Sequence, residues 1–315
     1  MISNETQSLV QVAIMYYKEH LNQQEIADKL NITRQTVMKM LKKAEDEGIV
    51  EFHINNPLNN LSDLADRLCE KYSLQHAVVV PCRFSEQDLV TSVLAQYAGN
   101  YIDELLSSGC VNVGISWGRS VYSTIANLQP GYHEDVTFFP LLGASNKTAE
   151  YFMVNEMVRK AAAAFNATPF YTYIPADPGS EHDYDLFRHT SAYESINEYW
   201  KKLDLAIMGI GVAPLSEKGF RSSYPGEQYI SHAQYENAVG DILTHYFDND
   251  GKFISNDGAK ILCASIEDLH NAGKVLAIAG GLNKAKAISA ALKTGIVTDI
   301  IIDQKTCEKV LKLGN

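Results

Sequence analysis

The chain has 315 residues, of which 46% are apolar and 21% are charged, and its formal net charge is −11. This length and composition fit a folded protein of two domains and exclude a disordered chain. No window approaches 18 uninterrupted apolar residues, and the opening MISNETQSLVQ lacks the basic and apolar regions of a signal peptide. We therefore expect a cytoplasmic protein without a membrane span. The five cysteines lie far apart without metal-ligand spacing, so neither a metal nor another cofactor is expected.

Short helices are predicted over the first 55 residues. Leu9, Val12, Ala13 and Tyr16 recur at helical spacing and predict a helix over about residues 6–19. Later in this segment, residues 50–54 alternate between apolar and polar side chains and predict a short wing or linking strand. The turn-rich NNPLNN at residues 55–60 ends the module.

Two capped helices follow the first one. Asn22 with Glu25 forms a capping-box pattern that begins a helix ending at Leu30. Thr33 is a natural cap for a third helix, over about residues 34–47, which Gly48 ends. Because only three residues separate the two helices, the pattern predicts a helix-turn-helix.

The second helix of this motif carries a local excess of basic residues in an acidic chain. Five basic residues and no acidic ones lie between Lys29 and Lys43, whereas residues 1–55 together hold six basic and eight acidic side chains. Arginine and glutamine can bond base edges, lysines can neutralise phosphates, and the helix start favours an anion. The alternative is a solvated basic face in an unrelated helical domain. The predicted DNA contacts are Thr33, Arg34, Gln35, Thr36, Lys39, Lys42 and Lys43, with Gln35 and Lys39 as base readers.

From residue 76 onward the pattern changes to short apolar runs that alternate with helical stretches. Such alternation predicts a mainly parallel, Rossmann-like sheet covered by helices on both faces. We therefore divide the chain into a helix-turn-helix DNA-binding domain at 1–55, a linker or dimer helix at 56–75, and an effector and oligomerisation domain at 76–315. The predicted strands cover 77–80, 111–115, 136–142, 205–210, 275–279 and 299–302, and the helices 87–107, 118–128, 151–165 and 283–293.

The motifs resemble those of the SorC family of bacterial transcriptional regulators along nearly the whole chain. The N-terminal match is YYKEHLNQQEIADKLNITRQTVMKMLKKAEDEGIVEFHI, and VGISWGRSVYSTIANL, YWKKLDLAIMGIG, VGDILTHYFDNDGK and AGGLNKAKAISAALKTGIVTDIIID follow in the family's order. The WGRS and GIG segments look most like sorbitol and sorbose operon regulators. The resemblance implies a winged helix-turn-helix and an effector domain related to sugar-phosphate isomerases and deaminases.

The function implied by this resemblance is regulation of a carbohydrate-catabolism operon. Operator binding would be controlled by a phosphorylated sugar or sugar alcohol, with a hexitol or ketose phosphate as the first expectation. A single small DNA-binding module has a narrow footprint, so we expect a homo-oligomer, a dimer or tetramer, on an imperfectly palindromic operator. The alternative is a sugar-phosphate isomerase or deaminase that carries a helix-turn-helix.

Four loops follow predicted strands and are expected to border one effector site. Residues 116–120 lie where a strand meets a helix, and 142–145, 209–211 and 280–281 hold the equivalent place after other strands. Ligands of open α/β sheets bind at the carboxyl ends of strands. The alternatives are an ordinary helix start with a surface arginine, and glycines that serve packing. Nucleotide binding is disfavoured, because GIGVAP has Pro214 at the third glycine position and no GxxxxGK[ST] motif occurs.

The resemblance adds charged candidates around these loops. Lys284 matches a family lysine at a helix start, Asp241 a family acid that faces sugar hydroxyls, and Arg221 a phosphate-binding arginine in a loose register. Lys147 could contact ligand, form an imine with an aldose, or belong to a mobile loop. The alternatives for Lys284 and Asp241 are a solvated lysine and an acid at a helix N-terminus. No acid–histidine pair stands beside Asp241, so no catalytic residue is predicted. The full set of expected ligand contacts is Ser116, Gly118, Arg119, Ser120, Gly143, Lys147, Arg221, Asp241, Gly280, Gly281 and Lys284.

Overall fold

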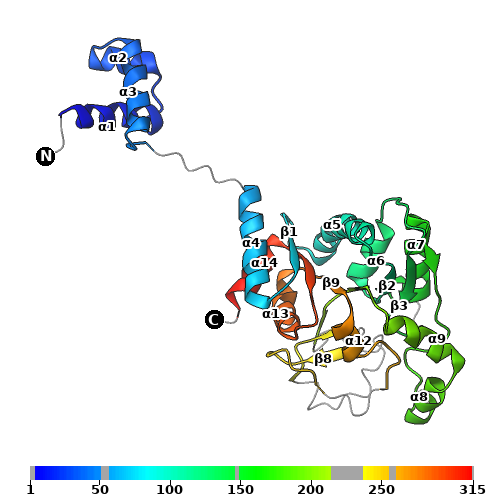
Figure 1. Cartoon of the computed structure of the whole chain (residues 1–315). Helices are drawn as coiled ribbons and strands as arrows, with labels where there is room; N and C mark the ends of the chain where they lie inside the picture. Colours follow the sequence, from blue (N-terminus) through cyan, green and yellow to red (C-terminus); the bar gives the residue numbers. More distant parts are fainter. Residues whose placement is uncertain (1–3, 51–56, 146–148, 214–236, 255–259, 314–315) are drawn as a thin grey trace. The chain divides into compact units, whose positions relative to one another are not determined.

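The computed structural model describes residues 4–50, 57–145, 149–213, 237–254 and 260–313 (Figure 1). The chain forms two compact units, Met1–Asn56 and Pro57–Asn315. No helix in the described ranges is long and apolar enough to cross a bilayer.

The N-terminal unit consists of three described helices, α1 (Asn4–Tyr17), α2 (Gln23–Leu30) and α3 (Arg34–Asp46). α1 packs against both of the others. Apolar residues at helical spacing form one small core, which contains Val12, Ile26, Ala27, Val37 and Leu41. The predicted strand at residues 50–54 lies almost entirely outside the described residues. The helix-turn-helix predicted from the sequence is confirmed by α2 and α3.

Local hydrogen bonds set the ends of α2 and α3. The Asn22 side chain accepts from the Gln24 and Glu25 amides at 3.0 and 3.1 Å, and the Glu25 carboxylate accepts from the Asn22 amide at 2.7 Å. This is the capping box that the sequence predicts. The Thr33 hydroxyl accepts from the Thr36 amide at 3.1 Å and begins α3. Asn31, with a φ of 52°, makes the left-handed turn between the helices.

A parallel sheet forms the centre of the second unit. Seven strands are described, in the spatial order β1-β10-β9-β5-β2-β3-β4, and every neighbouring pair is parallel. Most of their residues are apolar and buried, as a sheet covered on both faces requires, whereas both residues of the edge strand β4 are exposed. The strands are β1 (His76–Val80), β2 (Asn112–Ile115), β3 (Thr137–Pro140), β4 (Thr168–Pro169), β5 (Leu205–Met208), β9 (Lys274–Ile278) and β10 (Asp299–Asp303).

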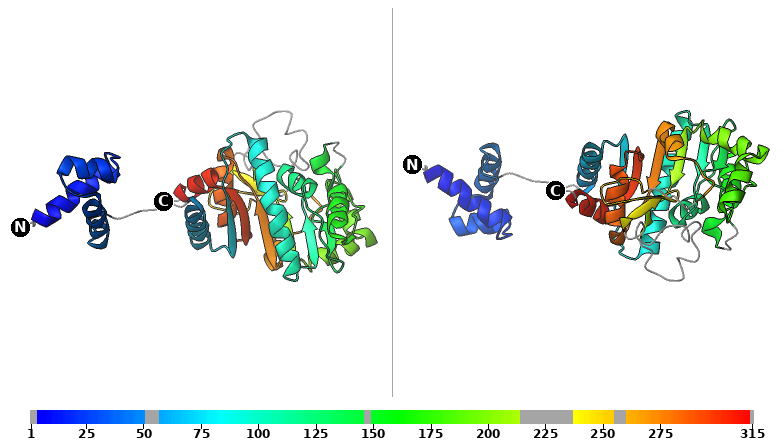
Figure 2. Two further views of the ribbon diagram at one scale, coloured as in Figure 1. Left: turned by 90° about the horizontal axis from the view of Figure 1, so that it is seen from above. Right: turned by 90° about the horizontal axis from the view of Figure 1, so that it is seen from below.

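Helices cover this sheet on both faces (Figure 2). α5, α6 and α7 pack together in one layer, whereas α4, α13 and α14 contact one another in a separate group. The helices are α4 (Pro57–Tyr72), α5 (Gln87–Ser107), α6 (Arg119–Ala126), α7 (Val154–Phe165), α8 (Glu181–Arg188), α9 (Ser191–Trp200), α12 (Ile266–Asn271), α13 (Ala285–Lys293) and α14 (Gln304–Lys312), with short 3-10 helices η1 (Glu150–Phe152) and η3 (Leu282–Lys284).

A small antiparallel sheet, absent from the sequence prediction, follows β5. It pairs β6 (Gly211–Val212) with β7 (Gly240–Ile242), and β7 with β8 (His245–Phe247). β7 also contacts α13. This sheet therefore brings residues near 240 to the end of β5.

The helix expected to act as a linker or dimer helix is α4, which belongs to the second unit. Its buried residues Leu64 and Leu68 lie in the main core, and the helix packs against β1 and α14. The Lys71 ammonium donates to the carbonyls of Leu311 and Leu313 at 2.8 and 2.7 Å. α4 thus packs on the second unit through its apolar face and is hydrogen-bonded to it through Lys71.

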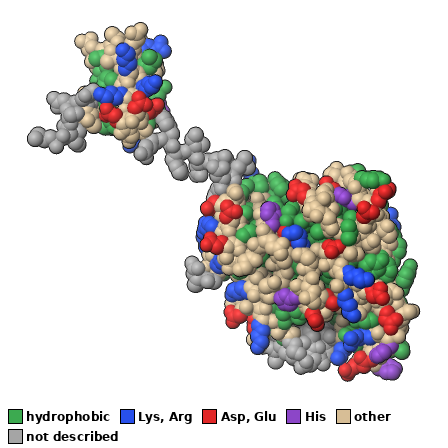
Figure 3. Space-filling view, viewed as in Figure 1, with side chains coloured by type: hydrophobic (Ala, Val, Ile, Leu, Met, Phe, Trp, Pro, Cys, Tyr) green, Lys and Arg blue, Asp and Glu red, His purple; other side chains and the backbone are tan. Residues whose placement is uncertain are grey.

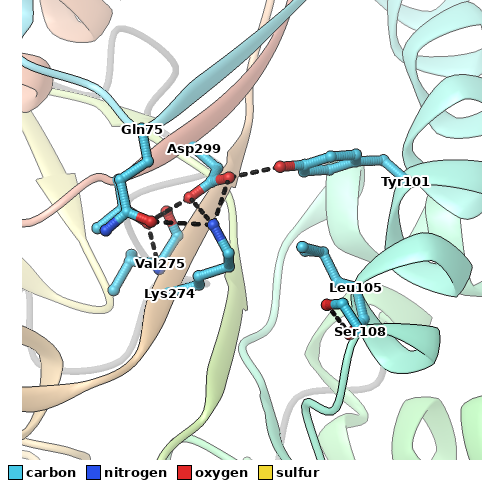
Figure 4. Close-up of polar contacts among 8 residues, drawn as sticks. Gln75, Tyr101, Leu105, Ser108, Lys274, Val275 and Asp299 are labelled. Carbon is cyan, nitrogen blue, oxygen red and sulfur yellow. Dashed lines mark hydrogen bonds and ion pairs between the residues drawn. The ribbon is translucent and has the colours of Figure 1, made fainter.

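A polar network around one buried carboxylate lies where β9 and β10 begin (Figure 4). Asp299 is fully buried and accepts from the Tyr101 hydroxyl at 2.5 Å and from the Lys274 ammonium at 3.3 Å. Lys274 also donates to the Gln75 side chain at 2.9 Å. Burial, together with the Asp299 carboxylate, raises the pKa of Tyr101 above its ordinary value. The network joins α5 to the start of β10, so it stabilises the fold.

Candidate effector site and DNA interface

The order of the strands creates a switch point between β2 and β5. From β2 the chain adds β3 and β4 on one side, and from β5 it adds β9 and β10 on the other. In such sheets the connections leave in opposite directions, and ligands bind where the two adjacent strands end. The predicted loops 116–120 and 209–211 follow these two strands directly. The sheet topology therefore brings them together.

Each of these two loops contains a glycine with open space beside its Cα. Gly118 has a φ of +120°, a conformation that residues with a side chain rarely adopt, and nothing lies within 4 Å of where its Cβ would be. A Cβ on Gly209 would also meet no atom within 4 Å. Both backbones are therefore accessible to a bound molecule.

Packing against η1 fixes the 116–120 loop. The Trp117 ring meets the Phe152 ring edge-on at 5.4 Å, and the Gly118 amide donates to the Tyr151 carbonyl at 2.8 Å. The Arg119 guanidinium lies over the Tyr151 ring, 5.5 Å from its centroid. Arg119 is also the first residue of α6, a helix that no side chain caps. A cation and the positive end of a helix thus share one position.

Lys284 follows β9, the other neighbour of β5, and contacts the backbone just after β5. It directly precedes α13, as the sequence predicts, and its half-buried ammonium donates to the Ile210 carbonyl at 3.0 Å. Burial lowers the pKa of Lys284, the Asp241 carboxylate raises it, and the Arg119 guanidinium lowers it. Arg119 begins α6 just after β2, and Lys284 donates to a carbonyl just after β5. Asp241 is paired with Gly211, which also follows β5. The three charged residues, far apart in sequence, therefore lie in one neighbourhood at the ends of these two adjacent strands.

Asp241 is held inside this neighbourhood by the small sheet. It is only 4% exposed, and its carboxylate accepts from the Thr244 amide at 3.2 Å. In the β6–β7 register Asp241 is opposite Gly211, where an added Cβ would lie 1.8 Å from the carboxylate oxygen. Glycine at 211 is thus needed for the carboxylate to keep its place.

The other predicted glycines are enclosed by the protein itself. The Gly143 amide donates to the Leu262 carbonyl at 2.8 Å, and a Cβ there would lie 2.4 Å from the Pro175 backbone. The Gly281 amide donates to Asp303 and Thr306, each at 2.9 Å. The Gly280 carbonyl accepts from the Gln87 side chain at 2.9 Å. These hydrogen bonds serve the fold, so the Gly143 and Gly281 amides are occupied without a ligand.

Two of the remaining predicted ligand contacts are serines in the 116–120 loop. Ser116 and Ser120 are buried, and the Ser116 hydroxyl donates to the Trp117 carbonyl at 3.0 Å. Lys147 and Arg221 lie outside the described residues.

A cavity of about 390 Å³ lies between the end of η1, the start of α7 and the residues after β3, and the sequence did not predict it. Ala144 and Ser145, which follow β3, form part of its wall, as do residues at the start of α7 and Tyr171 after β4. Phe152 borders this cavity and also packs on Trp117. In the sequence, only the predicted loop at 142–145 indicated a ligand site near this position.

The candidate DNA-binding residues lie on the surface of the N-terminal unit, where Figure 3 shows lysine and arginine side chains. Six of them are exposed, and the exception, Lys43, is partly buried and lies 3.6 Å from Glu47. The Arg34 guanidinium donates to the Gln23 side chain at 3.4 Å. The exposed six are Thr33, Arg34, Gln35, Thr36, Lys39 and Lys42.

Comparison with known proteins finds a matching family model for each of the two parts of the chain. Residues 56–312 match the family model "Putative sugar-binding domain", and residues 13–51 match "Winged helix-turn-helix DNA-binding". The chain is similar to the sorbitol operon regulator of Klebsiella pneumoniae, with 28% identity over 98% of this chain and 99% of that one. The crystal structure of that full-length regulator, SorC, covers 98% of this chain and 99% of its own, with a TM-score of 0.73 and 27% identity.

This chain belongs to the SorC family of bacterial transcriptional regulators. A second relative, the deoxyribonucleoside regulator of Bacillus subtilis (strain 168), is 29% identical over 96% of both chains. Because these relatives are named regulators and share the helix-turn-helix, this SorC-family chain is a DNA-binding transcriptional regulator and not an enzyme. The isomerase or deaminase alternative is not favoured.

Proposed function

We propose that this SorC-family regulator controls a carbohydrate-catabolism operon in the cytoplasm and responds to a phosphorylated sugar or sugar alcohol. The observation that carries the proposal is that Arg119, Lys284 and Asp241 lie around the ends of β2 and β5, at the switch point of the sheet. Two cations suit a phosphate, and a carboxylate suits sugar hydroxyls. The names of the sorbitol operon and deoxyribonucleoside regulators support an effector of this class.

The phosphate is proposed to bind between the start of α6 and Lys284. Its oxygens would accept from the Arg119 guanidinium and replace the Ile210 carbonyl as the acceptor of the Lys284 ammonium. The hydroxyl groups would donate to the Asp241 carboxylate, which is already oriented by the Thr244 amide. Gly118 and Gly209 leave the room that such a ligand needs.

The test is a titration of the operator complex with a panel of hexitol, ketose and pentose phosphates and their unphosphorylated counterparts. Linkage requires that an effector which changes operator affinity also binds the two protein forms differently. A phosphorylated compound should change operator affinity where its free sugar does not. Equal responses to both would remove the phosphate from the proposal. Chemical conversion of a sugar phosphate by the pure protein would favour the enzyme alternative instead.

The DNA contacts are proposed to be the six exposed residues at the start and outer face of α3, together with Lys43. Their footprint on one module is small, so we propose a homo-oligomer, a dimer or tetramer, that binds an imperfect palindrome. Half-sites should then lie whole helical turns apart. Sedimentation that finds one chain per operator would contradict this.

The outer face of α5 is proposed to contact a second copy. From Leu89 to Ile102 the helix carries no charged residue, and Leu89 and Tyr97 are 41% and 40% exposed. In the view from above in Figure 2, α5 crosses the front of this unit. Copies of a chain with a net charge of −11 repel one another least at an uncharged face. Tyr97→Glu should lower the mass found by sedimentation, whereas Ala192→Glu on the exposed face of α9 should not.

A further inference from the structure

Met38 is the most exposed large apolar side chain described in the N-terminal unit. It is 54% exposed, compared with 42% for Ile14 and 38% for Val10. The other two described methionines of this unit, Met15 and Met40, pack against its core. Met38 therefore does not serve the core, and its place in α3 needs another explanation.

Helical spacing puts Met38 among the proposed DNA contacts. The buried side of α3 is formed by Val37, Leu41 and Ala44. Met38 follows Arg34 by four residues and Gln35 by three, and it precedes Lys42 by four, so it shares their face of the helix. All of these neighbours are exposed. One flexible apolar side chain thus lies within a polar and basic surface.

The surrounding charge indicates what covers this side chain. A second copy of the same surface would bring the cations of Arg34, Lys39 and Lys42 against one another, which costs free energy. DNA phosphates would neutralise these cations instead. In the major groove the thymine methyl group is the apolar feature of the base edges, and an unbranched thioether adapts readily to such a group.

We propose that Met38 contacts a thymine methyl group in the major groove and so specifies a T·A pair next to the base pairs bonded by Gln35 or Lys39. The proposal rests on the proposed DNA contacts of α3 and adds the base that an apolar side chain selects. This contact can be measured separately from phosphate binding, because removing one thymine methyl group leaves the DNA phosphates unchanged.

The experiment removes that methyl group without changing base pairing. Full-length protein selects duplexes from a random DNA pool, and each thymine of the selected duplex is then replaced singly by deoxyuridine. Because one buried methyl group contributes about 0.8 kcal/mol, wild-type affinity should fall about fourfold at one position in each half-site. Met38→Ala should bind the thymine and deoxyuridine duplexes equally at that position.

Two variants serve as controls for this measurement. Ile14→Ala removes an exposed apolar side chain of α1 and should keep the wild-type sensitivity to the methyl group. Met38→Leu keeps an apolar side chain and should retain part of it. Circular dichroism melting of each variant verifies that the helices are intact.

Each outcome decides between the explanations. A selected duplex without any methyl-sensitive thymine overturns the proposal, as does a Met38→Ala variant that keeps the fourfold loss. If Met38→Ala instead lowers the sedimentation coefficient of the DNA-free protein and leaves methyl sensitivity intact, Met38 belongs to a contact between copies. If no duplex is selected at all, the DNA contacts proposed for α3 fail together with this inference.

Discussion

Replacing Lys284 by methionine tests the placement of the effector phosphate. Met keeps an unbranched side chain and removes the ammonium that now donates to the Ile210 carbonyl. A hydrogen bond to a charged group contributes about 1.5–3 kcal/mol, so effector affinity should fall about 13- to 160-fold. Lys286→Met is the matched control, because Lys286 is an exposed lysine two residues further on, in the first turn of α13.

Thermal stabilisation by the effector makes this loss measurable. An effector at 100 times its Kd should stabilise the wild-type protein by about 2.7 kcal/mol. If the Kd rises 13- to 160-fold, the same concentration stabilises Lys284→Met by only about 1.3 to 0.3 kcal/mol. Operator affinity without effector should stay the same, because α3 belongs to the other unit. Equal stabilisation of both proteins would show that Lys284 does not contact the phosphate.

The lowered pKa of Lys284 adds a dependence on pH to the same test. An unfolded lysine titrates near pH 10.4, whereas burial lowers the pKa of folded Lys284 below this value. Between the two values the unfolded chain holds more protons at this residue, so its contribution to the free energy of unfolding increases as pH rises. Urea unfolding at several alkaline pH values should show that increase in the wild type and in Lys286→Met. Lys284→Met should lack it, and an identical pH slope in all three proteins would contradict the assignment.

Three further substitutions address other parts of the structure. Gly211→Ala places a Cβ where the Asp241 carboxylate lies, so the effector Kd should rise, with little change in operator affinity without effector. Gln35→Ala should reduce discrimination at one base pair by about 1–3 kcal/mol in binding to singly substituted operators, and an equal loss on random DNA would make it a backbone contact. Asp303→Ala leaves the buried Gly281 amide without its carboxylate acceptor and removes the cap of α14, so urea unfolding should show a loss of about 1–3 kcal/mol.

The features that sequence predicted well depend on signals close together in the chain. The capping box at Asn22 and the cap at Thr33 involve residues three positions apart, and both form as expected. The helix predicted over 87–107 is α5, whose buried positions recur at helical spacing. Parallel strands such as β5 are continuous apolar runs, which composition alone makes visible. Local propensity and packing agree at these places, so the prediction needed no knowledge of distant contacts.

The small antiparallel sheet could not be predicted from local sequence patterns. Its strands contain two or three residues, too few for alternation to appear. Yet this sheet places Asp241 against Gly211 and orients its carboxylate through the Thr244 amide. The resemblance to the SorC family named Asp241, whereas the residues alone gave no reason for its position.

The Gly280–Gly281 pair shows why a glycine signal does not by itself identify a ligand site. Positive φ at Gly281 and close approach at Gly280 are real, as an anion-binding turn would need. However, the carboxylate of Asp303, at the end of β10, accepts from the Gly281 amide, and the same side chain caps α14 through the Thr306 amide. The turn therefore binds an anion that the protein supplies from 22 residues further along the chain. The Lys284 ammonium points instead to the Ile210 carbonyl at the switch point, so an effector phosphate is expected there, with Arg119, and away from the glycine turn.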